Sequence, residues 1–390
     1  MKKIVAFTAI RSEYDLLSSL YKLLNNDENI DLRLIVSGAH LSKTYGYSVK
    51  DIEADGLNIL AKIETLLDSD TRASRIKSAS ILLQSSIDVI ANYNPELIIF
   101  AGDREEVMVA SLIGGYLEIP TIHFFGGDHV EDSHVDNPVR HAASKLSSVH
   151  FVSTLEHKKR LIAMGEKEKR IFNIGSIALD KFKSEEIFSK KEIFKRFNVK
   201  KEFEKFAIVI FHPIPIERDK SAQIFENILI ALRSKGISAF VSYPNIDPGN
   251  KDIIEVIEKY RGDNNFIFYK NQPRKMFLSI YKNAEFIIGN SSSGVLESAS
   301  IPIGAINVGH RQTRRRSNEN LFFIDSSLEK IQETIDIVTS ESFKEKLKFV
   351  SNIYGDGNSA QKAYELIINT NFKDYIFKDE DALRLKWIKF

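Results

Sequence analysis

The densest group of chemically capable side chains lies between His123 and His141, in the stretch HFFGGDHVEDSHVDNPVRH. Within its 19 residues are four carboxylates, four histidines and one arginine. Two adjacent glycines near its start permit backbone angles that other residues avoid. Carboxyl groups gathered in this way can donate and accept protons, so the stretch predicts an acid–base site, with a solvated polar loop as the alternative.

His and acidic residues alternate in the same stretch, which raises the question of a metal ion. The spacing matches no recognised set of ligands such as HExxH, so we expect no metal site. Nothing in the sequence implies a redox cofactor, and we expect the protein to work without any cofactor.

Two further polar turns follow apolar runs in the first half of the chain. Arg11 stands in the turn TAIRSE, where a guanidinium and the N–H groups of a helix start can meet a phosphate. Asp103 follows Gly102 directly after an apolar run, which presents a carboxylate at the end of a strand. The alternatives are an ordinary helix start at Arg11 and a helix N-cap at Asp103.

The second half contains the turn GNSSSGVLE at 289–297, in which glycines and serines lead into a helix. Such a turn offers main-chain donors, hydroxyls and the positive end of a helix to a diphosphate, and Glu297 is placed to accept hydrogen bonds from ribose. It is no Walker loop, because the Gly-Lys-Ser/Thr ending is missing. His212 ends an earlier apolar run, and Arg311 follows a later one, either as part of a cationic wall or in a solvated basic loop.

Short β-rich runs that alternate with helix-spaced apolar stretches must position these residues. The alternation predicts right-handed βαβ units and parallel sheets, in which ligands bind beyond the carboxyl ends of the strands. The expected strands are Lys3–Thr8, Asp31–Ser37, Leu97–Ala101, Thr121–Phe125 and His150–Ser153, followed by Phe206–Phe211, Ser238–Tyr243, Phe266–Tyr269, Phe286–Gly289 and Ile303–Val308.

The length of 390 residues with 43% hydrophobic content favours two domains. A charged, Phe- and Lys-rich stretch around residues 184–206 separates the two strand series. We therefore expect an N-terminal Rossmann-like domain at 1–185, a C-terminal Rossmann-like domain at 200–370 and a helical, amphipathic tail at 371–390.

The formal charge of +1 leaves no global field to attract nucleic acid or an anionic membrane surface. No apolar stretch approaches the roughly 20 residues that span a bilayer, and the chain contains 0 cysteines. These features favour a cytoplasmic protein that has no nucleic-acid or membrane partner. Helices expected on the surface of the first domain make a homodimer the expected assembly.

The motifs, taken in order, resemble those of the hydrolysing UDP-N-acetylglucosamine 2-epimerases of sialic-acid and legionaminic-acid biosynthesis, within the UDP-GlcNAc 2-epimerase superfamily of the GT-B fold. The resemblance runs from the first strand to about residue 325. It rests on Arg11, GAHLSKTYG at 38–46, GDR at 102–104, GGD at 126–128, Asp136, RHAASKLSSVHF at 140–151, FHP at 211–213, YPNIDPGN at 243–250, GNSSSG at 289–294 and GHRQ at 309–312.

The resemblance implies two doubly wound domains that face a central cleft, with the nucleotide held mainly by the second. The family removes the C2 proton of the sugar, expels UDP and adds water, which gives a free 2-epimerised sugar such as N-acetylmannosamine or a 2,4-diacetamido-6-deoxy analogue. By resemblance, Asp103, Asp136, Arg140 and His212 belong to the catalytic group. The implied substrate contacts are Arg11, His40, Asn245, Ser291, Ser292, Gly294, Glu297 and Arg311.

This chain departs from the family in the acidic loop. Many relatives have His-x-Glu-Gly-Gly where this chain has Phe125 before Gly126 and Gly127. Our hypothesis is that Asp128 or Glu131 supplies the missing carboxylate. Alternative functions are a non-hydrolysing 2-epimerase, a GT-B glycosyltransferase and a nucleotide-sugar-binding protein without turnover, and the sequence does not separate UDP from GDP.

Overall fold

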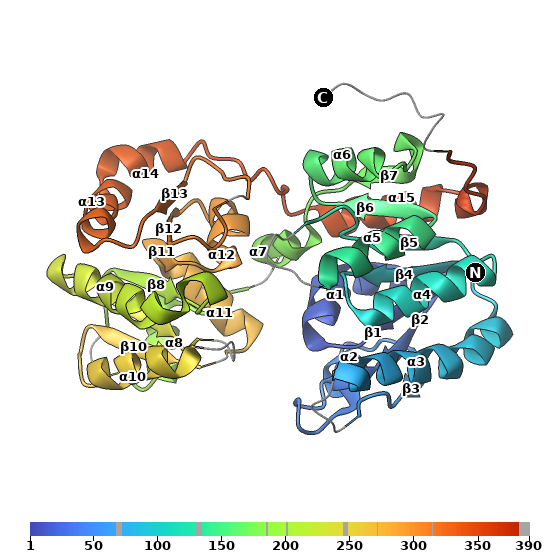
Figure 1. Ribbon diagram of the computed structural model, residues 1–390, viewed down its shortest axis with the longest axis horizontal. Coiled ribbons are helices and arrows are strands. Elements are labelled where there is room, and N and C mark those ends of the chain that lie inside the picture. Colours follow the sequence, from blue (N-terminus) through green and yellow to red (C-terminus); the bar gives the residue numbers. More distant parts are fainter. Residues whose placement is uncertain are drawn as a thin grey trace. The chain divides into compact units, whose positions relative to one another are not determined.

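The computed structural model describes residues 1–67, 72–129, 135–184, 186–199, 202–244, 249–270, 272–313 and 315–381, which form two compact α/β units (Figure 1). One unit comprises Met1–Lys181 together with the chain from Gly357 onward, and the other comprises Phe182–Asp356. Each unit is built on its own parallel sheet, which confirms the predicted α/β class with two doubly wound domains.

The first unit has a seven-stranded parallel sheet in the order β3-β2-β1-β4-β5-β6-β7. Its strands are β1 (Lys2–Thr8), β2 (Ile30–Ser37), β3 (Ile59–Ile63), β4 (Leu97–Ala101), β5 (Thr121–Phe124), β6 (Val149–Val152) and β7 (Ile171–Asn173). Its helices are α1 (Arg11–Asn25), α2 (Val49–Ala54), α3 (Arg72–Tyr93), α4 (Glu105–Tyr116), α5 (Asp136–Leu146), α6 (Leu155–Ala163) and α15 (Ser359–Asn369), and α7 (Asp180–Ser184) spans the boundary between the units.

The second unit has a six-stranded parallel sheet in the order β10-β9-β8-β11-β12-β13. Its strands are β8 (Phe206–Ile210), β9 (Ser238–Ser242), β10 (Phe266–Tyr269), β11 (Phe286–Gly289), β12 (Gly304–Val308) and β13 (Leu321–Ile324). Its helices are α8 (Lys190–Arg196), α9 (Ser221–Ser234), α10 (Asn250–Tyr260), α11 (Arg274–Asn283), α12 (Ser292–Leu296), α13 (Leu328–Thr339) and α14 (Glu341–Leu347).

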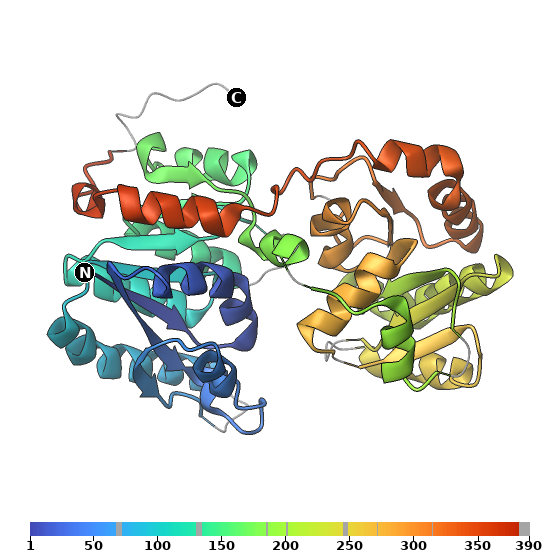
Figure 2. The same ribbon diagram turned by 180° about the vertical axis from the view of Figure 1, so that it is seen from behind.

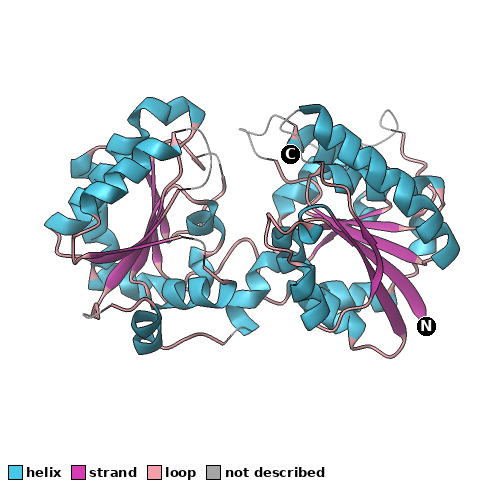
Figure 3. Cartoon of the chain, turned by 90° about the horizontal axis from the view of Figure 1, so that it is seen from below, coloured by secondary structure: helices cyan, strands magenta, loops and turns pink. Residues whose placement is uncertain are grey.

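The central strands are continuous apolar runs because helices cover both faces of each sheet (Figure 3). Every residue of β4 (LIIFA) and of β8 (FAIVI) is buried. Each of these strands lies near the middle of its sheet, and the polar residues that follow them are brought to the carboxyl edge. The predicted strands are all present, while β3, β7 and β13 were not predicted.

The C-terminal segment differs from the predicted domain division. Residues from Gly357 to Asp381 pack with the first unit, where α15 lies beside α1 (Figure 2) and the hydroxyl of Tyr364 donates to Asp27 Oδ2 at 2.8 Å. Asp180 accepts the N–H groups of Ser359 at 3.0 Å and Ala360 at 2.5 Å, which fixes the start of this helix. The second unit therefore ends before residue 370.

The expected helical tail is largely absent from the described residues. One short 3-10 helix, Phe372–Tyr375, is followed by non-helical chain to Asp381. The backbone carbonyls of Tyr375 and Phe377 accept hydrogen bonds from the buried guanidinium of Arg170, which also pairs with Glu380. These contacts use the carbonyls that a helix would need for its own hydrogen bonds. Residues 382–390 lie outside the described chain.

Lys378 anchors the same segment at a second buried point. Its ammonium lies 2.6 Å from Glu166 Oε2, and Glu166 Oε1 pairs with Lys145 at 2.7 Å. Burial alone favours the protonated carboxyl, but His150, Lys378 and Lys145 outweigh it and lower the pKa of Glu166 to about 2. Lys378 also donates to the backbone carbonyls of Lys145 at 3.0 Å and Ser147 at 2.8 Å, so the tail is held both to Glu166 and to the C-terminal end of α5.

Candidate active site

Arg140 contacts two of the predicted acid–base residues in the first unit and lies one turn of α5 from a third. Its buried guanidinium donates from Nη2 to the carboxylate of Asp103, which follows β4. The Nη1 group donates to the backbone carbonyl of Asp128 at 3.1 Å and to Asn137 Oδ1 at 3.2 Å. Asp136 begins α5, one turn before Arg140. One guanidinium therefore connects the turn after β4, the loop after β5 and α5.

The carboxyl group of Asp103 holds its proton more tightly than an ordinary aspartate. Burial raises its pKa, Arg140 opposes the rise, and the charges of Asp136 and Asp128 add to it. The net direction is upward. A carboxyl whose pKa moves toward neutrality is better suited to exchange a proton with a substrate than a fully exposed one.

Asp128 is itself positioned by two neighbours. The backbone N–H of His129 donates to its Oδ1 at 2.8 Å, and His157 Nε2 lies 3.3 Å from the same oxygen. His157 stands in the first turn of α6, after β6. Sequence reasoning missed this histidine, although its place just beyond a strand end was a usable signal. Glu131, the other predicted substitute carboxylate, lies outside the described residues.

The loop geometry explains the two glycines and leaves Phe125 without a polar role. Phe125 has φ +65° and packs partly against the core of the unit. A Cβ at Gly127 would lie 2.4 Å from the carbonyl oxygen of His157, and one at Gly126 would lie 3.2 Å from Ser144 Oγ. Only glycine fits at Gly127, where φ is +76°. The loop backbone is thus fixed closely enough to place Asp128 beside Arg140.

His123 holds the turn before Asp103 through a hydrogen bond to its backbone. Its Nε2 lies 2.8 Å from the carbonyl oxygen of Gly102, and its Nδ1 lies 3.0 Å from Ser144 Oγ. Burial lowers the pKa of His123 to about 3, so the ring is neutral at physiological pH and donates one hydrogen bond to the Gly102 carbonyl. The ring therefore fixes the turn that carries Asp103.

His40 is placed differently from its predicted role as a substrate contact. It is completely buried, with Nε2 at 2.9 Å from Thr8 Oγ1 and Nδ1 at 2.7 Å from Ser48 Oγ. Burial lowers its pKa to about 4, so the ring is neutral. Both ring nitrogens are engaged, and His40 ties the end of β1 to the chain before α2. Arg11, by contrast, is exposed at the start of α1, with Nε 3.8 Å from Asp51 Oδ2.

A buried pair of carboxyl groups, Glu13 and Glu106, was missed by sequence reasoning. Glu13 Oε2 accepts the backbone N–H of Ala9 at 3.2 Å, which shapes the turn before Arg11. Burial and the neighbouring Glu106 raise the pKa of Glu13 well above its usual range. Arg104 Nε donates to Glu106 Oε1 at 3.2 Å. No motif marks this pair, because its members meet only when the turns after β1 and β4 are folded together.

In the second unit, the side chain of Asn290 holds the turn that carries His212 by two hydrogen bonds. Its side chain accepts the backbone N–H of His212 at 2.8 Å and donates to the backbone carbonyl of the same residue at 2.8 Å. Asn290 is buried, and the preceding Gly289 approaches β8 so closely that a Cβ would lie 2.0 Å from the carbonyl oxygen of Ile210. Arg311 Nη1 donates to the backbone carbonyl of Asn290 at 3.4 Å. His212 and Arg311 are thus joined through one residue, since His212 bonds to the side-chain amide of Asn290 and Arg311 to its backbone carbonyl.

The serine-rich turn forms the start of α12. Ser291 caps the helix by accepting the N–H of Ser293 at 3.3 Å, and Ser292 begins it. Ser293 Oγ donates to Glu297 at the end of the helix. Gly294 is buried where α12 packs on β11. The predicted residues Ser291, Ser292 and Glu297 therefore lie at the two ends of one short helix.

Glu297 has an arginine partner that the sequence analysis missed. Arg274 Nη2, from the first residue of α11, lies 3.5 Å from Glu297 Oε1. Burial raises the pKa of Glu297, while Arg274 and Ser293 oppose the rise. Arg274 also lies over the rings of Phe182 and Phe277, which fix its guanidinium. Asn245, another predicted substrate contact, lies outside the described residues.

The turn that carries Arg311 is held by Glu217. The backbone N–H of His310 lies 3.2 and 3.3 Å from the two carboxylate oxygens of Glu217. Gly309, with φ +84°, lies so close to that carboxylate that a Cβ would be 2.8 Å from both oxygens. Asn307 Nδ2 donates to the carbonyl of Arg311 at 2.8 Å. The turn is therefore fixed by buried polar contacts.

Among the described residues, no three His or acidic side chains are grouped so that they could hold a metal ion. No helix in the described part of the chain is long and apolar enough to cross a membrane.

Solved structures define the class of the fold. The chain is 17% identical to UDP-GlcNAc 2-epimerase from Neisseria meningitidis bound to UDP-GlcNAc, with a TM-score of 0.76 over 95% of this chain and 100% of that one. A putative UDP-N-acetylglucosamine 2-epimerase from Listeria monocytogenes gives a TM-score of 0.77 at 16% identity, over 94% of this chain and 96% of that one. The protein is thus an α/β protein of the GT-B fold.

Sequence comparison gives the family. The family model described as UDP-N-acetylglucosamine 2-epimerase matches residues 22–368. The chain is 33% identical over 367 residues to the UDP-N,N'-diacetylbacillosamine 2-epimerase (hydrolyzing) of Legionella pneumophila, with 94% of this chain and 96% of the relative covered. It is 32% identical over 347 residues to the GDP/UDP-N,N'-diacetylbacillosamine 2-epimerase (hydrolyzing) of Campylobacter jejuni, with 88% and 89% covered. The chain belongs to the UDP-N-acetylglucosamine 2-epimerase family, whose members are nucleotide-sugar 2-epimerases.

Proposed function

We propose that this protein is a hydrolysing 2-epimerase that converts a UDP-linked 2-acetamido sugar into UDP and the free 2-epimer. The observation that carries the proposal is the cluster of Asp103, Asp128 and Asp136 around Arg140, in which burial and neighbouring charge raise the pKa of Asp103. Such a cluster supplies the acid and the base that removal of a proton from C2 and its later return require.

The proposed reaction has two steps. A carboxylate of the cluster takes the C2 proton, the C2–H electron pair forms a C1=C2 double bond, and the C1–O bond to UDP breaks with its electrons on the diphosphate. Water then adds across the double bond, so that its hydroxyl joins C1 and a proton joins C2 on the opposite face. UDP leaves with added negative charge, and fixed cationic and N–H groups stabilise that charge more in the transition state than in the ground state.

We assign binding of the nucleotide to residues of the second unit. His212 and Arg311, joined through Asn290, would meet the diphosphate together with Ser291 and Ser292. Glu297, whose carboxylate is oriented by Arg274 and Ser293, would accept hydrogen bonds from the ribose hydroxyls. Arg11, exposed in the first unit, would add a further cationic group.

The preferred substrate in this proposal is UDP-N,N'-diacetylbacillosamine, a 2,4-diacetamido-6-deoxy sugar nucleotide. The two relatives that carry this substrate in their names are each more than 30% identical to the chain. Purified protein incubated with this compound should release UDP and free 2,4-diacetamido-2,4,6-trideoxymannose in equal amounts. Recovery of only the 2-epimerised nucleotide sugar, with no free UDP, would establish a non-hydrolysing epimerase instead.

One observation favours a second candidate function. Phe125 stands where many relatives carry a glutamate, and its ring packs partly against the core rather than offering a polar group. A nucleotide-sugar-binding protein without turnover would retain the second-unit contacts and tolerate this change. Binding of the same compound with no release of UDP by the wild-type protein would support that function.

A further inference from the structure

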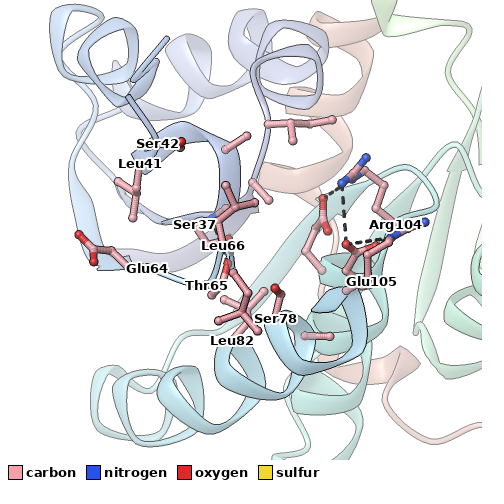
Figure 4. A pocket seen from close by; sticks show the side chains of 18 of the residues that line it. Ser37, Leu41, Ser42, Glu64, Thr65, Leu66, Ser78, Leu82, Arg104 and Glu105 are labelled. Carbon is pink, nitrogen blue, oxygen red and sulfur yellow. Dashed lines mark hydrogen bonds and ion pairs between the residues drawn. The ribbon is translucent and has the colours of Figure 1, made fainter. Parts of the chain in front are cut away.

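A large pocket opens at the carboxyl edge of the first unit, apart from the carboxylates that Arg140 gathers. It has a volume of about 710 Å³ and is bordered by the turns after β1, β2, β3 and β4 together with the first half of α3 (Figure 4). Leu41, Ser42, Thr65, Leu66 and Leu82 are among its lining residues. This volume lies within the range of small-molecule sites.

The pocket and the acid–base cluster use adjacent residues of the turn after β4. Arg104 lines the pocket, and its neighbour in the chain, Asp103, is the carboxylate held by Arg140. Ala9 and Ile10, in the turn just before Arg11, line it as well. A substrate whose C2 proton is presented to Asp103 would therefore carry its other ring substituents within reach of this pocket.

The charges in the pocket argue against a phosphate. Arg75 Nη2 lies 2.6 Å from Glu105 Oε2, and Arg104 Nε lies 3.2 Å from Glu106 Oε1, so the guanidinium groups in its wall are paired with carboxylates. Glu64 adds a further carboxylate to the lining. An anionic ligand would meet a surface that is neutral to acidic, whereas a neutral group would not be repelled.

The rest of the lining combines apolar side chains with hydroxyls. Leu66 and Leu67 remain 48% and 37% exposed, so a methyl group placed against them would remove apolar surface from water. Ser37, Ser42, Thr65 and Ser78 supply hydroxyls between the leucines. An acetamido group fits a lining of apolar side chains and hydroxyls, because its amide donates and accepts hydrogen bonds while its methyl group is apolar.

We propose that this pocket receives the 4-acetamido group and the adjacent 6-methyl group of the substrate, and that it selects a 2,4-diacetamido-6-deoxy sugar over N-acetylglucosamine. The proposal rests on the function proposed above, since it assigns a specificity pocket to the same reaction. It places the neutral end of the substrate in the first unit and leaves the diphosphate to the cationic and N–H groups of the second.

The test introduces larger side chains at Ser78, a position of α3 that lines the pocket. Ser78→Phe and the smaller Ser78→Leu place an apolar side chain in the cavity, while Ser80→Phe makes the same change at an exposed position of α3 that is not part of the lining. For UDP-N,N'-diacetylbacillosamine, kcat/KM should fall about 100-fold in Ser78→Phe and less in Ser78→Leu. UDP-GlcNAc turnover should fall by less than about threefold, and Ser80→Phe should match wild type for both substrates.

The inference is overturned if the Ser78 variants, folded as judged by urea unfolding, turn over both substrates in the wild-type ratio. A wild-type protein without any turnover refutes the proposed function, and titration calorimetry then decides on the pocket. Weaker binding of UDP-N,N'-diacetylbacillosamine but not of UDP in Ser78→Phe upholds the pocket. Equal weakening of both, unchanged binding, or a wild-type protein that binds neither compound overturns it.

Discussion

The guanidinium of Arg140 donates to the carboxylate of Asp103 and, through its other terminal nitrogen, to the backbone carbonyl of Asp128. The side chain is buried, so this contact operates in a medium of low polarity. Arg140 thus positions the carboxylate that we assign to proton transfer, while burial outweighs the charge of Arg140 and raises the pKa of Asp103. The first predictions concern this group.

Replacing Asp103 with asparagine should lower kcat by about 10³-fold, since the amide keeps the shape of the side chain but can neither take nor return a proton. The affinity for UDP, measured by titration calorimetry, should stay within about twofold, because we assign the nucleotide to other residues. Asp88→Asn, on an exposed part of α3, is the matched control and should leave both values unchanged. Full turnover by Asp103→Asn would remove this residue from the mechanism.

Neutralising Asp136 should shift the acid limb of the pH–rate profile to lower pH. The negative charge of Asp136 raises the pKa of Asp103, so Asp136→Asn lowers that pKa and keeps the base ionised at more acidic pH. The profile of kcat/KM between pH 4 and 8 measures the shift in whatever activity remains. An acid limb that moves to higher pH, or stays in place, would show that Asp103 does not control it.

The loss of a carboxylate at Phe125 predicts that a neighbouring acid has become essential. Asp128→Asn and Glu131→Gln are the variants to compare, and at least one should lower kcat about 100-fold. Asp128 has the structural support for the role, since its carboxylate lies 3.3 Å from His157 Nε2 and its carbonyl is held by Arg140. Full activity in both variants would refute the substitution hypothesis.

Asn290→Asp should weaken UDP binding at least about tenfold, because a carboxylate cannot donate to the His212 carbonyl and adds negative charge beside the proposed diphosphate site. The unsatisfied carbonyl should also lower the free energy of unfolding by about 1–3 kcal/mol. Asn227→Asp on α9 is the control, because it also removes a side-chain donor to a backbone carbonyl, that of Ser326, but at a position outside the proposed nucleotide site. An affinity for UDP equal to that of the control variant would contradict the role that we assign to Asn290 in holding the His212 turn.

The anchoring of the C-terminal segment is a prediction about stability. Glu380→Gln leaves the buried guanidinium of Arg170 without its counter-charge and should reduce the free energy of unfolding by about 3 kcal/mol in urea. Asp379→Asn, next to it in the chain, removes an exposed pair with Lys167 that water already screens, so its effect on the free energy of unfolding should be much smaller. Equal effects would mean that the buried pair does not hold the segment.

The sequence predicts the central strands well because helices cover both faces of the sheets, so that LIIFA and FAIVI are continuous apolar runs. The strands that it misses lie at sheet edges. Of these, β7 has only three residues, and β3 (ILAKI) is interrupted by a lysine, so pairing in the sheet rather than composition makes these two segments strands. The third, β13 (LFFI), is a short apolar run that the sequence analysis did not recognise as a strand.

Site residues that follow strand ends were predictable, since the carboxyl edge of a parallel sheet collects them. Contacts between turns that are distant in the sequence were not predictable. Glu13 meets Glu106, and Arg274 meets Glu297, only after folding, and neither pair has a sequence motif. The same limit explains His40, whose motif indicated substrate binding although both of its ring nitrogens are bonded inside the unit.

The most direct test of the proposed function is turnover of UDP-N,N'-diacetylbacillosamine in D₂O, followed by NMR for wild type and Asp103→Asn. We predict that wild type releases UDP together with a free sugar that is inverted and deuterated at C2, and that Asp103→Asn does so about 10³-fold more slowly. Release of UDP with a sugar that keeps its C2 proton would contradict the account, because it would show that UDP leaves without proton removal at C2.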